Sequence, residues 1–276
     1  AELKARGPAH PSLVLDLDRL DHNIREVLRS IGPDKHLRIV AKSLPSLPLL
    51  KYISDKAQTQ RLMLFHQPFV NLVASQFPKA DILLGKPMPV RAAEQFYEQH
   101  KNEQPVATPE RFNPARQLQW LIDTPERLNE YLALARFKEL HLKINIEIDV
   151  GLHRGGVADT ETLDSMLKII EANPYFLEFA GFMGYEPHIV KVPPPLGNRD
   201  TLFAQVINTY QSHVDHVRQN YPTLWHDDLT LNGAGSTTHK LYESDQLIND
   251  LSIGSGLVMP TDFDLDTLAE HQPALF

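Results

Sequence analysis

The chain has 276 residues, 42% of them hydrophobic, so it can bury a large core, and its length fits a single barrel of about 250 residues. A formal net charge of −8 argues against a nucleic-acid partner, because no basic stripe is available to neutralise phosphates. The sequence contains no cysteine, which excludes disulfides, thiolate metal sites and a cysteine nucleophile.

No apolar run approaches the roughly 18 residues that a membrane span requires, so no membrane partner is expected. We expect a cytoplasmic protein. Because the sequence begins with Ala1 rather than methionine, removal of a signal peptide or tag remains open.

Apolar strands and amphipathic helices alternate along the chain. The first helix is predicted over Leu20–Ile31, with Asp18 as its N-cap and Gly32 at its end. Further helices are predicted at Pro125–Arg136, Thr160–Ala172 and Asp200–Asn220. Strands are predicted at Arg38–Ala41, Leu62–Phe65, Asp81–Leu84, Gln119–Ile122, Leu142–Ile148, Leu177–Met183, Asp228–Asn232 and Leu251–Ile253.

Eight strands separated by helices predict an α/β fold, a closed (β/α)₈ TIM barrel rather than an open doubly wound sheet. Two stretches interrupt the alternation. Residues 98–116 are polar and broken by prolines, which predicts a surface loop or lid. Pro193-Pro194-Pro195 predicts a stiff rim of the active site rather than a peptide-binding segment.

The stretch from Glu147 to Val157 reads Glu-Ile-Asp-Val-Gly-Leu-His-Arg-Gly-Gly-Val and follows an apolar run. A buried strand that ends in an acid, glycines and an arginine is typical of the catalytic edge of α/β barrels. The simpler alternatives are an ordinary turn with a solvated Arg154, or a structural salt bridge from Arg154 to Asp149 or Glu147.

A short β-branched strand delivers Lys42 at its carboxyl end, directly before Ser43 and the turn at Pro45. If the side chain turns inward, burial lowers the pKa of its ammonium group. The resulting amine is the type of nucleophile that forms Schiff bases with carbonyl compounds and pyridoxal phosphate. A lysine that simply reaches solvent is the alternative.

A third strand end, from Leu229 to Thr238, runs Leu-Thr-Leu-Asn-Gly-Ala-Gly-Ser-Thr-Thr. Glycines let the backbone approach a ligand, and successive N–H groups with hydroxyls bind phosphate. The stretch is neither a P-loop nor a dinucleotide fingerprint, because the required lysine and third glycine are missing. It predicts a phosphate site made by Asn232, Gly233, Gly235, Ser236 and Thr237, helped by Gly254 and Ser255 after the last strand.

Together, these strand ends resemble the fold-type III pyridoxal-phosphate enzymes, the alanine-racemase-like barrels, and most closely their D-serine dehydratase and D-threonine aldolase branch. The stretch from Pro11 to Ile24 looks like that family's opening strand and first helix. Ala41-Lys42-Ser43 matches its Schiff-base lysine, residues 148–156 its mid-barrel arginine motif, and 184–188 its Tyr-Glu-x-His strand end. The resemblance covers about residues 10 to 260.

The resemblance implies that Lys42 binds pyridoxal 5′-phosphate as a Schiff base and then serves as the base for the substrate Cα proton. Arg154 would lie near the phenolic oxygen of the cofactor, where a cation favours the ionised form. Tyr185 would orient the cofactor ring, and His188 would stack on it or shuttle a proton.

Members of this family continue past the barrel into a β-rich domain, which completes the active site across a homodimer. In the dehydratase and aldolase branch that domain also supplies ligands for a divalent metal. We therefore expect the barrel over residues 13–254, with 1–12 and 255–276 contributing to an incomplete β-domain whose first strand is Leu257 to Pro260. A fragment, an omitted disordered part and a barrel-only protein remain open.

No metal-ligand pair is expected in the chain itself, and a divalent metal would require the missing domain. His213 and His216 lie three residues apart on a helix predicted to be outside the barrel, and are expected to be a solvated pair.

The leading functional prediction is a pyridoxal-phosphate-dependent lyase, a dehydratase or aldolase that acts on small β-hydroxy amino acids resembling D-serine or D-threonine. One alternative is an amino-acid racemase on the same scaffold, and another is a barrel that binds the cofactor without turnover. A phosphosugar barrel that binds phosphate at residues 233–237 and leaves Lys42 unmodified is a further alternative.

Overall fold

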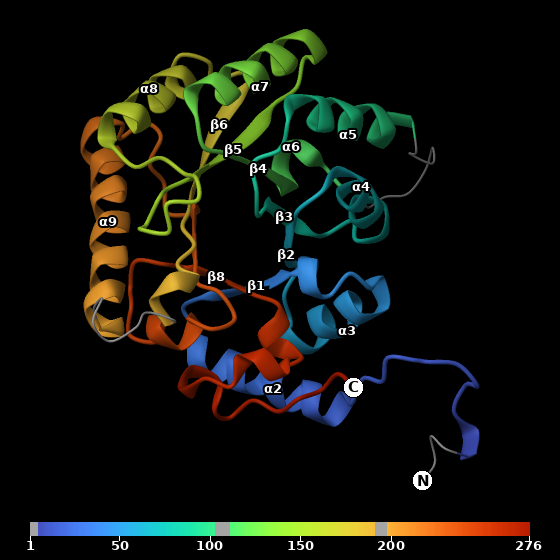
Figure 1. Cartoon of the computed structure of the whole chain (residues 1–276). Coiled ribbons are helices and arrows are strands. Elements are labelled where there is room, and N and C mark those ends of the chain that lie inside the picture. Colours follow the sequence, from blue (N-terminus) through green and yellow to red (C-terminus); the bar gives the residue numbers. More distant parts are fainter. Residues whose placement is uncertain (1–4, 103–110, 191–197) are drawn as a thin grey trace.

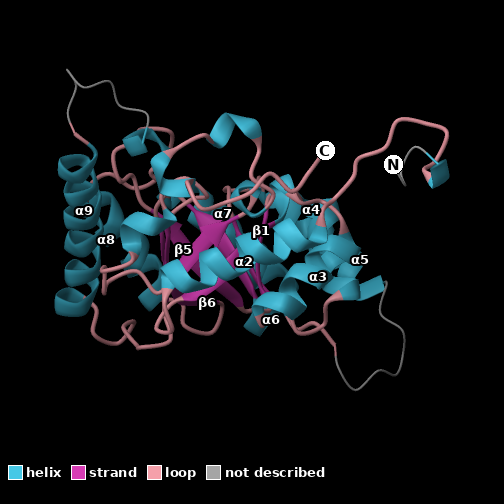
Figure 2. Ribbon diagram, turned by 90° about the horizontal axis from the view of Figure 1, so that it is seen from below, coloured by secondary structure: helices cyan, strands magenta, loops and turns pink. Residues whose placement is uncertain are grey.

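A computed structural model describes residues 5–102, 111–190 and 198–276. Within them, parallel strands form a closed barrel in the order β1 to β8, and β8 pairs with β1. The strands lie at the centre and the helices surround them (Figures 1 and 2). The predicted (β/α)₈ barrel is confirmed. In this part of the chain no helix combines the length and apolarity needed to cross a membrane.

All eight predicted strands are present, each within two residues of its predicted ends. Their bounds are β1 His36–Val40, β2 Arg61–Leu64, β3 Asp81–Leu84, β4 Leu118–Ile122, β5 Leu142–Glu147, β6 Leu177–Met183, β7 Thr230–Gly233 and β8 Asp250–Ile253. The register shifts between Ile144 and Asn145 where β5 pairs with β6, and Gly181 has a φ of +125° there. A Cβ atom at Gly181 would lie 2.0 Å from the carbonyl oxygen of Thr230, so only glycine fits this bulge.

The longer helices are α2 Leu17–Ile31, α3 Leu47–Ala57, α4 Gln67–Gln76, α5 Val90–Asn102, α7 Pro125–Lys138, α8 Thr160–Glu171 and α9 Arg199–Asn220. Helix α2 starts three residues before the predicted position, because Asp16 rather than Asp18 accepts the hydrogen bond from the backbone N–H of Arg19. The predicted loop over 98–116 is partly wrong, since α5 extends through Asn102 and α6 occupies Pro114–Gln117. Pro193-Pro194-Pro195 lies outside the described residues.

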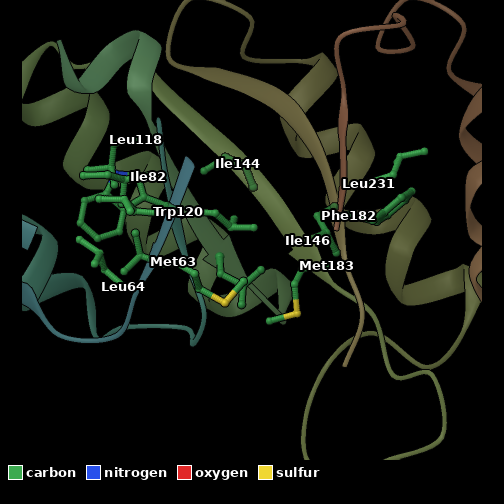
Figure 3. Packing of buried hydrophobic residues seen from close by; sticks show 14 of the residues in the cluster. Met63, Leu64, Ile82, Leu118, Trp120, Ile144, Ile146, Phe182, Met183 and Leu231 are labelled. Carbon is green, nitrogen blue, oxygen red and sulfur yellow. The ribbon is translucent and has the colours of Figure 1, made fainter. Parts of the chain in front are cut away.

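Apolar side chains fill the layer between the strands and the helices. Figure 3 shows part of this layer, with labelled residues that come from β2 to β7, among them Met63 and Met183, which instead line a cavity inside the barrel. On the helix side, the buried positions recur at helical spacing, as in Leu20, Ile24, Val27 and Ile31 of α2. The prediction that His213 is solvated is wrong, because it is only 2% exposed and packs against Phe182.

The interior of the barrel is unusually polar at the amino-terminal ends of the strands. Arg38 of β1 is fully buried and forms a two-pronged pair with Asp250 of β8, with N···O distances of 2.7 and 3.0 Å. Its third nitrogen lies 2.9 Å from the carboxylate of Asp81 in β3, and Arg61 of β2 lies 2.7 Å from Asp250. Burial acts to raise the pKa of Asp250, but the two arginines outweigh it and hold that pKa below its ordinary value.

The segment after β8 forms short 3₁₀ turns and packs beside α2 (Figure 1). The strand expected from Leu257 to Pro260 is wrong, because Ser255–Leu257 is the 3₁₀ turn η5. Asn23 of α2 holds the segment by donating to the carbonyl oxygens of Leu257 and Gln272 at 2.9 and 2.7 Å. One antiparallel bridge joins Leu15 to Leu275, and the assignment of both ends to a β-domain stays a prediction.

Replacing Arg38 by methionine should destabilise the barrel by about 3–5 kcal/mol, because Asp250 would remain buried with only the partly exposed Arg61 as its cationic partner. The measurement is the free energy of unfolding in urea. Lys51→Ala, which removes an exposed pair with Asp55, is the control and should leave the midpoint nearly unchanged. Equal midpoints for the two variants would contradict a stabilising role for the buried pair.

Candidate active site

A cavity of about 220 Å³ opens at the carboxyl ends of the strands, where barrel enzymes place their chemistry. It is lined by Val40, Lys42, Ser43, Met63, Phe65, Gly85, Lys86, Arg154, Met183, Gly184, Tyr185, Asn232, Ala234, Gly235, Ser236, Thr237, Ser252, Gly254, Ser255 and Phe263. The three strand ends singled out in the sequence therefore meet in one place.

Lys42 reaches the cavity from the 3₁₀ turn η1, Ala41–Ser43, which directly follows β1. Its ammonium nitrogen lies 5.0 Å from the centroid of the Phe65 ring, a cation–π contact across the ends of β1 and β2. Of the two alternatives for Lys42, a buried amine and a lysine that reaches solvent, the structure shows the exposed one, and the side chain lines the cavity. The amine is accessible to a ligand without any rearrangement of the barrel.

The segment that follows β5 folds into a tight loop held by Asp149. Its carboxylate accepts hydrogen bonds from the backbone N–H groups of Gly151 and His153, both at 3.0 Å. Burial acts to raise the pKa of Asp149, but these bonds and the nearby His153 ring hold it below its ordinary value. Gly156 has a φ of +98°, and a Cβ there would meet the backbone N of Asp149 at 2.7 Å. The loop thus presents Arg154 to the cavity.

Arg154 is paired, and its partner is Glu147 rather than Asp149. One guanidinium nitrogen lies 3.7 Å from Glu147, and the guanidinium carbon lies 5.1 Å from the centroid of the Tyr185 ring. Lys86 lies 3.1 Å from the same Glu147 oxygen. Burial raises the pKa of Glu147, and the two cations oppose this.

Lys86 is a cavity residue that the sequence reasoning missed. It follows β3 within Leu84-Gly85-Lys86-Pro87, a strand end with the same pattern that identified Lys42. Glu147 carries one negative charge, whereas Lys86 and Arg154 carry two positive charges. This wall of the cavity is therefore suited to an anionic group.

The opposite wall comes from the loops after β7 and β8, which the hydroxyl of Ser236 joins. Its oxygen accepts hydrogen bonds from the backbone N–H groups of Gly254 and Gly256 at 3.2 and 2.9 Å. A Cβ at Gly254 would lie 2.8 Å from the carbonyl oxygen of Val40, so this backbone packs directly on the end of β1. With both lone pairs engaged in this way, the Ser236 hydroxyl proton remains available to an anion.

Two residues that were predicted to bind phosphate, Asn232 and Gly233, are engaged or placed differently in the structure. The side-chain amide of Asn232 donates to Asp250 at 2.6 Å and to the hydroxyl of Ser252 at 2.8 Å, so its hydrogen-bonding capacity is used within the barrel. Gly233 does not appear among the lining residues within the described chain, and a Cβ there would meet Ile248 at 3.3 Å. Gly235, Ser236, Thr237 and Ser255 do line the cavity, as does Gly254.

The strand end after β6 brings Tyr185 into the cavity but not His188. Burial and the neighbouring Glu186 raise the pKa of Tyr185, which keeps its phenol protonated at neutral pH. His188 lies in the 3₁₀ turn η2, Pro187–Val190, next to Gly151 and outside the set of described lining residues. Burial and the nearby His153 lower its pKa.

No group of three or more histidine, aspartate or glutamate side chains that could hold a metal ion occurs within the described residues. His213, on α9, instead places its Nδ1 atom 2.8 Å from the carbonyl oxygen of Thr209.

The sequence matches the alanine racemase N-terminal domain family over residues 15–260. The chain belongs to this family. No curated protein shows significant sequence similarity to it. The match to this family confirms the expected resemblance to the fold-type III pyridoxal-phosphate enzymes.

Solved structures similar to this alanine-racemase-type barrel include two lyases and a racemase. A variant of D-threo-3-hydroxyaspartate dehydratase has 16% identity and a TM-score of 0.77, over 97% of this chain and 64% of that chain. D-threonine aldolase from Filomicrobium marinum has 17% identity and a TM-score of 0.76, with coverages of 98% and 69%. Alanine racemase from Bacillus anthracis has 19% identity and a TM-score of 0.73, with coverages of 97% and 64%. The chain thus spans about two thirds of the length of these proteins, and the likeness shows a shared fold.

Replacing Ser236 by alanine should destabilise the protein by about 1–3 kcal/mol, because the partly buried N–H groups of Gly254 and Gly256 would lose their acceptor. Urea unfolding measures the change. Ser43→Ala, which removes an exposed hydroxyl on the same cavity, is the matched control. A loss of stability no greater in Ser236→Ala than in the control would show that this hydroxyl does not hold the two loops together.

Proposed function

We propose that this barrel binds pyridoxal 5′-phosphate and acts on a small amino acid, as a lyase on D-configured β-hydroxy amino acids. The observation that carries the proposal is one cavity that combines an accessible amine, Lys42, with a wall of hydroxyls and backbone at 235–237 and 254–255. Membership of the alanine racemase N-terminal domain family supports the same cofactor.

The residues present fit the two ends of this cofactor. Ser236, Thr237 and Ser255 offer hydroxyls for a phosphate ester, and the close packing of Gly254 on Val40 brings this wall beside the turn that holds Lys42. Strand β8 pairs with β1, and β7 follows next to β8. On the other side of β1, β3, which precedes Lys86, is two strands away, and β5, which precedes Arg154, lies opposite β1 in the barrel. Neutral donors and cations thus lie on different sides of Lys42.

Bound pyridoxal phosphate supplies an electron sink that makes the Cα substituents of an amino acid labile. Lys42 would hold it covalently and, in its free form, accept or return a proton at Cα. Arg154 would favour the ionised phenolic oxygen, and its contact with the Tyr185 ring would fix both side chains. The apolar side chains of Met63, Phe65 and Phe263 would limit access of water.

The lyase assignment is supported by the dehydratase and the aldolase among the solved structures that share this fold. A racemase is the alternative. Its supporting observation is Tyr185, a second proton-carrying group in the same cavity, whose pKa is raised by burial. Racemisation needs two such groups, one for each face of Cα.

A homodimer and a divalent metal bound by a further β-rich domain are part of the same proposal and rest on the family likeness alone. A cytoplasmic location is also proposed, as expected from the composition. The proposed role of His188 next to the cofactor also rests on the family likeness, because within the described residues it packs against Gly151 and does not line the cavity.

Incubation with pyridoxal phosphate followed by borohydride should attach a pyridoxyl group to Lys42, and peptide mass mapping should locate it. Lys42→Ala should abolish the adduct, because the nucleophilic amine is removed. Lys86→Met is the matched control, a second cavity lysine whose loss should leave the adduct in place. An unmodified wild-type chain, or an adduct on Lys86, would remove the basis for the cofactor.

The loaded protein should convert D-serine to pyruvate and ammonia, or D-threonine to glycine and acetaldehyde. The L-enantiomers are the controls. Carbonyl product is measured together with deuterium exchange at Cα in heavy water. Deuterium incorporation with loss of optical rotation and no carbonyl product would select the racemase instead.

A further inference from the structure

Glu186 is a buried carboxyl group that the proposed chemistry does not use. It directly follows Tyr185 after β6 and is only 1% exposed. The hydroxyl of Thr238 donates a hydrogen bond of 2.6 Å to its Oε1 atom. Its Oε2 atom has no hydrogen-bond partner among the side chains and backbone groups that the structure describes. Burying a carboxyl group incurs a desolvation cost, so its contact with Thr238 is expected to have a function.

The contact fixes the orientation of one hydroxyl in the phosphate-side loop. The oxygen of Thr238 accepts a hydrogen bond of 2.8 Å from the backbone N–H of Gly235. A hydroxyl has a single proton, and with its oxygen engaged by Gly235 that proton points to Glu186. The Gly235 carbonyl oxygen in turn accepts the N–H of Thr238 at 3.1 Å, which closes the loop.

This closed loop displays the two residues between its ends to the cavity. Ser236 and Thr237 both line it, and Ser236 also joins the loop to the backbone after β8. A Cβ at Gly235 would lie 3.0 Å from the ring of Tyr185, so the loop also packs against the strand end that carries Glu186. Glu186 therefore connects the end of β6 to the loop after β7 without lining the cavity itself.

The surroundings of Glu186 shift it toward its neutral form. Burial raises its pKa to about 7, against opposing hydrogen bonds from Thr238, from Tyr242 and from the backbone of Ala234. The phenols of Tyr185, Tyr210 and Tyr242 are close enough for the carboxyl charge to raise their pKa values. A neutral acceptor of the same shape, glutamine, should therefore preserve the contact with Thr238.

We propose that Glu186 is a positioning residue for phosphate binding, which acts through the Thr238 hydroxyl to hold Gly235, Ser236 and Thr237 in the arrangement that receives a phosphate ester. The inference deepens the proposed function, because it rests on a phosphorylated ligand in this cavity. It assigns Glu186 a role at the phosphate end only, with no contact to the reacting atoms.

The test compares pyridoxal phosphate with pyridoxal, which differ only in the phosphate ester. Glu186→Leu removes the acceptor and should weaken the affinity for pyridoxal phosphate by about tenfold, the equivalent of one lost hydrogen bond. The affinity for pyridoxal should change by less than about twofold. Glu186→Gln should restore the wild-type affinity for both. Equal weakening for both ligands, or none for either, would overturn the proposal.

A second pair of variants covers the case in which Glu186→Leu does not fold. Thr238→Val removes the hydroxyl and should reproduce the phosphate-specific loss, whereas Thr238→Ser keeps it and should behave as the wild type. A wild-type affinity in Thr238→Val would count against the connection from Glu186 to the loop.

Inorganic phosphate separates this inference from the proposed function. If Lys42 does not react with pyridoxal phosphate but phosphate binding, followed by calorimetry, weakens in Glu186→Leu and not in Glu186→Gln, the cofactor proposal fails and the role of Glu186 stands. If Lys42 reacts and the phosphate affinity of Glu186→Leu equals that of the wild type, the role of Glu186 fails and the cofactor proposal stands.

Discussion

The buried pair between Arg38 and Asp250 is the constraint on which the barrel depends. It joins the first strand to the last, and the same arginine reaches Asp81 on β3, so one guanidinium group spans the closure of the sheet. Both partners are fully buried, and removing either leaves the other charge in the interior with only a partly exposed partner, Arg61 for Asp250 or Asp81 for Arg38. Closure at this point places the end of β1 beside the end of β8, and thereby brings Lys42 next to Gly254 and Ser255.

The position of the cavity follows from the alternation of side chains along those two strands. On β1 the inward residues are Arg38 and Val40, and on β8 they are Asp250 and Ser252. The ion pair occupies the lower layer, and Val40 and Ser252 line the cavity above it. A shift of one residue in the register would turn the side chains of the ion pair and of the cavity toward the helices. The pairing that stabilises the fold therefore also orients the site.

The strands and the main site residues could be predicted because each strand end shows a local pattern: an apolar run that stops at a lysine, an arginine loop or glycines and hydroxyls. Other features depend on contacts between distant segments. Lys42 is exposed because η1 turns the chain after β1, and Glu186 acquires its role from Thr238, more than fifty residues away in sequence. Lys86 could have been predicted from the sequence, because it follows a strand end as Lys42 does. Asn232 was predicted to bind phosphate from its place in the strand-end pattern. Its bonds to Asp250 and Ser252, which arise only when the barrel closes, could not be predicted from the sequence.

The distribution of charge in the cavity sets how an anionic ligand would lie in it. The wall formed by the loops after β7 and β8 offers hydroxyls and N–H groups, whereas Lys86 and Arg154 lie on the opposite side. Glu147 neutralises only part of that positive charge, because its single carboxylate faces two cations. A ligand with an anion at each end would therefore be held across Lys42, with its more directional contacts at the neutral wall and its longer-range attraction at the cationic one.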